Sequence, residues 1–390
     1  MVKRIAQFGV LLASLLGAAA VQAHHGGGAL RVAAILSLTG SASGLGQPAA
    51  RVLELEVQRE NSAGGVLEHE VRLTIRDDAS DPARAAVLAN ELANPSRTDV
   101  VIGGNVTGTS LAIARAAQKA GVLFIALGLS ARIVEPGRSF VFKTPPTDRM
   151  AIAAVLGDMR KRGLREIQVL YVNDAFGRAA RNEVRLYTHP QGLGYREYGI
   201  RLIETLALAP DGGDVAARLK RVEARPGRGV LIIAAGELAS QVTRAYRETG
   251  IGLPAYQTHA AACPAFLRES GVAADGVRLP VPPLALAVER APDDPARAPM
   301  EAFARVYRER FGDEPCANAG YARDAIGLVF NAMSRIEGSG FGNLRIALEL
   351  TPDYRGVTGR YQLHPSNHLG LAPSALRMAE VRGGRFVPVD

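Results

Sequence analysis

The segment IGGNVTGTS, residues 102–110, shows how this chain is organised. A short apolar strand ends at its glycines, small and hydroxyl residues follow, and we expect a helix over residues 110–120. The first N–H groups of a helix have no partner inside the helix, so hydroxyls and N–H groups here can bind an anion. Residues 125–130 repeat the pattern at the next strand end. Ligands of parallel sheets bind beyond the carboxyl ends of strands, so the two corners predict a site for one small carboxylate, with simple helix capping as the alternative.

Outward from this segment, apolar runs typical of strands alternate with segments of helical spacing. The expected strands are 30–38, 71–75, 100–103, 122–126, 167–172, 200–206 and 230–234, and the helices between them include 47–61, 81–93, 150–162, 178–186, 215–222 and 238–249. A Pro-rich stretch, 280–299, then precedes helices over 300–311 and 322–336, and short strands are expected in 357–388. This alternation predicts an α/β protein with two doubly wound parallel-sheet lobes.

Composition restricts the class of protein. The chain has 390 residues, enough for two domains, with 47% hydrophobic and 22% charged residues, which are globular values. The formal net charge of +8 comes from Arg and Lys scattered among acidic residues, and Trp is absent, so we expect no nucleic-acid partner. Two cysteines exclude a disulfide scaffold and a multi-Cys metal site.

The amino terminus has the pattern of a secretory signal. Lys3 and Arg4 precede an apolar run over residues 10–21, and Val21-Gln22-Ala23 is a small-x-small cleavage site. We therefore expect residues 1–23 to be removed after Ala23 and the mature protein to be periplasmic. His24 and His25 would then begin the mature chain. We interpret them as an ordinary polar terminus, and a metal site formed with the free amine is the less favoured alternative.

Other motifs argue against an enzyme. Residues 44–49, GLGQPA, match a dinucleotide fingerprint on paper, but five residues separate the first glycine from the preceding strand. We see no nucleophile elbow and no P-loop, and we predict no catalytic residue, metal or cofactor. Asp174 and Glu237 follow strands, where each could reach a ligand or cap a helix. Cys263 and Cys316 could form a disulfide, which the sequence leaves open.

Several segments in order resemble the periplasmic Leu/Ile/Val-binding protein family, the type I solute receptors of ABC importers. They are LSLTGSASGLGQ (36–47), DDASDP (77–82), IGGNVTGTS (102–110), KAGVLFIALGLS (119–130), VLYVNDAFGRA (169–179), GELASQVTRAYRETGI (236–251), FARVYRERFGDEP (303–315) and YARDA (321–325). The resemblance implies two lobes joined by three crossovers, with a ligand cleft that closes about a hinge. Its lobes would be residues 24–146 with 279–355, and residues 147–278 with 356–390.

The resemblance also implies which residues bind the ligand. Hydroxyls at Thr107 and Ser130 would hold its carboxylate, Phe176 would take the place of a closing tyrosine, and Leu45 would contact its side chain. The supporting backbone N–H groups would come from Gly108, Thr109 and Gly128.

One departure from the family bears on the ligand. The family places an acidic residue in the second lobe to pair the ligand ammonium, but residues 257–261, which include His259, have no carboxylate. An unpaired buried ammonium is costly, so either Glu237 or Asp174 substitutes or the ligand has no ammonium.

We therefore expect a monomeric periplasmic binding protein that delivers a solute to permease subunits of an ABC importer. A branched or aromatic amino acid is the first expectation, an organic or aromatic acid the alternative, and a sensor acting on a membrane partner a second alternative.

Overall fold

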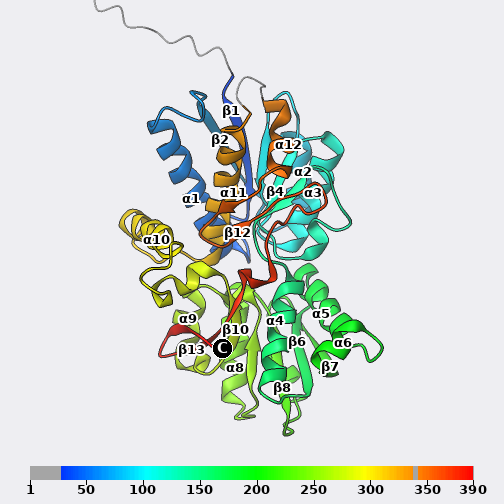
Figure 1. Cartoon of the computed structure of the whole chain (residues 1–390). Helices are drawn as coiled ribbons and strands as arrows, with labels where there is room; N and C mark the ends of the chain where they lie inside the picture. The colour runs from blue at the N-terminus through cyan, green and yellow to red at the C-terminus, as the bar shows by residue number, and fades with distance from the viewer. Residues whose placement is uncertain (1–27, 337–340, 390) are drawn as a thin grey trace, which may run out of the picture.

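The computed structural model describes residues 28–336 and 341–389, and it has two lobes stacked along one axis (Figure 1). The first lobe contains a parallel five-stranded sheet in the order β2-β1-β3-β4-β5. Its strands are β1 (Leu30–Leu36), β2 (Val71–Asp77), β3 (Val100–Gly103), β4 (Leu123–Ala126) and β5 (Val141–Lys143). The leader expected over residues 1–23 and the histidines after it lie outside the described residues.

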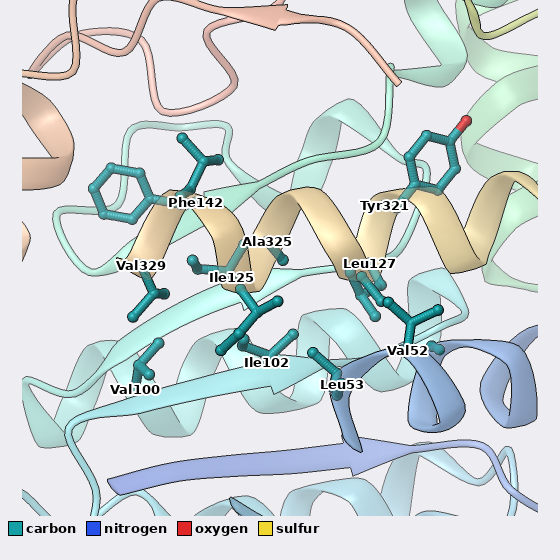
Figure 2. Packing of buried hydrophobic residues seen from close by; sticks show 14 of the residues in the cluster. Val52, Leu53, Val100, Ile102, Ile125, Leu127, Phe142, Tyr321, Ala325 and Val329 are labelled. Carbon is teal, nitrogen blue, oxygen red and sulfur yellow. The ribbon is translucent and has the colours of Figure 1, made fainter. Parts of the chain in front are cut away.

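Helices cover both faces of this sheet. They are α1 (Ser43–Ser62), α2 (Pro82–Leu92), α3 (Thr107–Ala120), α10 (Arg297–Phe311), α11 (Ala317–Met333) and α12 (Leu344–Glu349). Figure 2 shows α11 lying over the sheet, with Ala325 and Val329 directed toward Ile102 and Ile125 of the central strands. Burying one valine or isoleucine side chain contributes about 1.5–3 kcal/mol to the stability of the fold. The pattern on both faces is that of a doubly wound sheet, as the alternation predicts.

The second lobe contains a seven-stranded sheet in the order β14-β13-β10-β9-β8-β6-β7. Its strands are β6 (Glu166–Val172), β7 (Arg201–Leu208), β8 (Arg228–Ile233), β9 (Ala255–Gln257), β10 (Arg278–Val281), β13 (Arg377–Arg382) and β14 (Arg385–Pro388). Its helices are α4 (Asp148–Lys161), α5 (Ala175–Thr188), α6 (Leu193–Tyr198), α7 (Val215–Leu219), α8 (Gly236–Glu248) and α9 (Pro264–Ser270). Strands β13 and β14 form an antiparallel edge on an otherwise parallel sheet.

The chain passes between the lobes three times. The first passage lies between β5 and α4, the second follows β10, and the third precedes β13. Among the described residues, no helix combines the length and apolar character needed to cross a membrane.

The expected boundary at residue 356 is wrong. Val357, Tyr361 and Ala375 belong to the first lobe's core, and the chain joins the second sheet only at β13. The cause is Asp324 on α11, whose buried carboxylate accepts the backbone N–H groups of Val357 and Thr358, both at 2.8 Å. The Tyr361 hydroxyl also donates to the Thr144 carbonyl at 3.0 Å. These bonds fix the segment to the first lobe.

Candidate functional site

The first turns of α3 and α5 face each other where the lobes meet. A Cβ atom added at Gly108 would lie 3.9 Å from the Cβ of Ala175, which is van der Waals contact. A second approach joins Gly236, at the start of α8, to the Ser41 carbonyl, 3.8 Å from an added Cβ. The carboxyl ends of both sheets therefore lead into one interface, the position where open α/β sheets bind ligands.

The start of α3 carries a hydroxyl that has no partner. Val106 occupies the N-cap position and makes no side-chain cap bond. Thr107 is 2% exposed and its Oγ1 has no hydrogen-bond partner in the described structure. By contrast, the Thr109 hydroxyl donates to the Val106 carbonyl at 3.1 Å, and the Ser110 hydroxyl donates to the Gly104 carbonyl. The free hydroxyl stands beside N–H groups that a helix leaves unpaired at its first turn, so this end of α3 can accept an anion.

The end of β4 packs directly against this corner. A Cβ added at Gly128 would lie 2.4 Å from Ser110 Oγ, so the glycine leaves room for the Ser110 side chain against this strand end. Ser130 is fully buried, and its Oγ accepts the Arg132 N–H at 3.3 Å. The two strand ends that the sequence singles out thus lie together, although the Ser130 hydroxyl also caps a short turn.

His259 lies beside the first passage between the lobes. Its Nε2 is 3.1 Å from the Pro146 carbonyl, and the buried Lys143 ammonium donates to Pro145 and Pro146 carbonyls at 2.6 and 3.3 Å. Burial, together with the Lys143 charge, lowers the pKa of His259 to about 3, so the ring is neutral near pH 7. A carbonyl only accepts, so Nε2 carries the proton and Nδ1 is an acceptor, for which the described structure supplies no partner.

The two acidic candidates are not equivalent. Asp174 caps α5, accepting the Gly177 N–H at 2.7 Å. Its side chain reaches solvent yet is largely surrounded by protein, and this desolvation raises its carboxyl pKa. Glu237 is exposed in the first turn of α8. Neither Asp174 nor Glu237 is a buried carboxylate, which is what a fully enclosed ligand ammonium would need as a partner.

Phe176 and Leu45 differ in how firmly they are held. Phe176 is 6% exposed and belongs to the core of the second lobe, where Leu129 of the first lobe packs against the same cluster. Leu45 is partly exposed, and it lies within α1 rather than in a loop before it. The helix begins earlier than expected because the N–H groups of Leu45 and Gly46 already bond the Ala42 carbonyl, at 2.9 and 3.1 Å.

Among the described residues, other buried polar groups that the sequence did not indicate as binding residues also lack a partner, and three of them are relevant here. Gln257 Oε1, Thr258 Oγ1 and the Tyr321 hydroxyl have no partner in the described structure. Figure 2 shows the Tyr321 hydroxyl pointing away from the apolar cluster that its ring joins. Polar residues at and directly after the end of a buried strand were the available signal for Gln257 and Thr258. Tyr321 gave none, because its helical spacing is that of a core residue.

Comparison with known proteins agrees with this architecture. Residues 29–385 match the model of a family described as periplasmic binding protein. Among curated relatives, Leu/Ile/Val-binding protein homolog 8 of Brucella abortus (strain 2308) is 27% identical over 184 residues, which are 44% of this chain and 43% of that protein. The alignment thus spans less than half the length of that relative.

Solved structures align over almost the whole chain. An extracellular ligand-binding receptor from Rhodopseudomonas palustris HaA2 has a TM-score of 0.84 at 23% identity, covering 93% of this chain and 99% of that one. The substrate binding protein LivJ of a branched-chain amino acid transporter from Streptococcus pneumoniae, in complex with isoleucine, has a TM-score of 0.77 at 19% identity, covering 93% and 99%. A solute binding protein of an ABC transporter from Rhodopseudomonas palustris BisB5, in complex with 3,4-dihydroxy benzoic acid, has a TM-score of 0.78 at 20% identity, covering 93% and 96%.

At these identities the solved structures establish a shared type I periplasmic binding protein fold. The family match covers nearly all of the sequence, and the chain therefore belongs to the periplasmic binding protein family.

Proposed function

We propose that this protein is a periplasmic solute-binding protein of an ABC importer and captures a small carboxylate in a cleft between its lobes. The observation that carries the proposal is the buried, unpaired hydroxyl of Thr107 at the uncapped start of α3. A buried polar group without a partner is costly, and a ligand carboxylate would remove that cost.

The carboxylate would be bound by donors of the first lobe. The Thr107 hydroxyl and the N–H groups of Gly108 and Thr109 come from one helix start, and Gly128 and Ser130 lie on the neighbouring strand end. Donors fixed by a helix and a packed strand lose little entropy on binding, and hydrogen bonds to a charged acceptor are the stronger kind.

For the rest of the ligand, we favour an acid without an ammonium group. Gln257 Oε1 and the neutral His259 Nδ1 are buried acceptors, which suit a ligand hydroxyl. The known complex of a relative of this fold with 3,4-dihydroxy benzoic acid supports the class. An amino acid is the second candidate, because Asp174 caps α5 beside the lobe interface. A ligand ammonium near its carboxylate would offset the cost of desolvating that carboxylate.

A thermal-shift screen with matched ligands tests the proposal. The probes are 3,4-dihydroxybenzoate against catechol, and isoleucine and phenylalanine against their deaminated acids. A ligand that binds only the folded state stabilises it by about 2.7 kcal/mol at a concentration of one hundred times Kd.

We expect the melting temperature to rise with acids and not with catechol, which lacks the carboxylate. An equal rise with catechol would contradict the carboxylate site, and a rise with amino acids alone would assign the ammonium to Asp174 or Glu237. Conversion of a bound probe to a product would refute the binding-protein assignment. Transport by cells with and without the gene separates an importer from a sensor.

A further inference from the structure

The two cysteines of the chain lie on opposite lobes and against each other. Cys263 precedes α9 in the second lobe, and Cys316 precedes α11 in the first. Cys316 is 4% exposed and belongs to the first lobe's core, and Cys263, half-buried, packs against that same core from the other lobe. The pair therefore spans the boundary between the lobes.

Neighbouring residues hold the two segments together. Arg268 of α9 forms an ion pair with Asp313, with 3.2 Å between Nη1 and Oδ1. Pro264 and Pro315, each next to one of the cysteines, line the same surface groove of about 970 Å³. The approach of the cysteines thus belongs to a wider contact between the start of α9 and the start of α11.

The surroundings of Cys316 favour its thiolate. The neighbouring Cys263 thiol and the N–H groups at the start of α11, including those of Asn318 and Ala319, lower the pKa of Cys316, although burial opposes this. The same interaction raises the pKa of Cys263, which keeps its proton. A thiolate at a helix start beside a second thiol is the arrangement that reacts in thiol–disulfide exchange.

We propose that Cys263 and Cys316 form a reversible disulfide that ties the two lobes together. The two thiols, not bonded in this structure, lose two protons and two electrons and form one Sγ–Sγ bond. A disulfide oxidant, R–S–S–R, accepts them and is cleaved to two R–SH. An exported protein meets such oxidants, and the inference holds whichever solute binds.

The position of the Cys263–Cys316 disulfide predicts that it restricts the hinge motion of the lobes. The chain between the cysteines contains the second passage between the lobes, after β10. A covalent link across this passage limits how far the lobes can rotate apart, while the interface at α3 and α5 stays free of it. The ligand-free oxidised protein should therefore be more closed than the reduced one.

The test treats the full mature protein with oxidised glutathione. Free thiols are counted with a chromogenic disulfide in denaturant, and the intact mass is measured. We expect both thiols to disappear, the mass to fall by two hydrogens, and a digest to contain one peptide joining residues 263 and 316. The controls Cys263→Ser and Cys316→Ser each keep one thiol, which stays free or takes one glutathione.

The result that would overturn the proposal is wild-type protein that keeps both thiols, gains glutathione, or forms a reducible dimer. This readout needs only the wild-type chain, so a variant that fails to fold does not affect it. Small-angle scattering of the ligand-free protein tests the hinge: we expect a smaller radius of gyration after oxidation that reverses with dithiothreitol, and an unchanged radius would refute the tether.

Discussion

Replacing Thr107 with valine should separate ligand binding from folding. The substitution exchanges one hydroxyl for a methyl group of nearly the same size at a side chain that is 2% exposed. In the ligand-free protein the hydroxyl has no partner, so its removal breaks no hydrogen bond. We therefore expect the free energy of unfolding without ligand to stay unchanged or to rise by up to about 1 kcal/mol.

The effect on binding should have the opposite sign. A hydrogen bond from a hydroxyl to a charged carboxylate contributes about 1.5–3 kcal/mol, so its loss should raise Kd about 10- to 150-fold. Titration calorimetry with the best acid from the screen measures this change, and thermal melts without ligand measure stability.

Thr109→Val is the matched control on the same turn of α3. Its hydroxyl donates to the Val106 carbonyl at 3.1 Å, so this variant should lose about 1 kcal/mol of stability and keep most of its affinity. Unchanged Kd in Thr107→Val, or an equal loss of affinity in both variants, would refute the role given to the Thr107 hydroxyl.

Three other measurements address stability. Asp324→Asn leaves at least one buried N–H of the 357–358 segment without its acceptor and should cost about 1–3 kcal/mol in chemical unfolding; an unchanged midpoint would contradict this. The pKa of His259 is about 3 in the folded protein, so only the unfolded chain binds this proton as the pH falls below about 6.5. At pH 5 the free energy of unfolding of the wild type should therefore be about 2 kcal/mol lower than at neutral pH. His259→Gln should not show this loss. The same pH dependence in both proteins would exclude this cause. A disulfide between Cys263 and Cys316 closes a loop of about 50 residues and should add about 4 kcal/mol over the reduced protein, whereas equal unfolding midpoints would speak against it.

The sequence alone predicted the features that depend on neighbours in the chain. The longer strands and helices followed from hydrophobic periodicity, whereas the three-residue strands β5 and β9 were not predicted. Asp81 before Pro82 marked the start of α2, where its carboxylate accepts the Ala83 N–H at 2.8 Å. The turn with Thr107 at the start of α3 was visible for the same reason, since a strand end, small residues and a helix start are local signals.

Tertiary structure alone decided which distant groups meet. Nothing near residue 357 indicates that a carboxylate on α11 will bind its N–H, so the expected boundary at 356 was wrong. Likewise, the spacing of Cys263 and Cys316 says nothing of their approach, and Thr107 could be identified as a hydroxyl but not as one left unpaired. The physical reason is that periodicity and capping are satisfied within a few residues, whereas the partner of a buried polar group or thiol is chosen by packing of segments far apart in the chain.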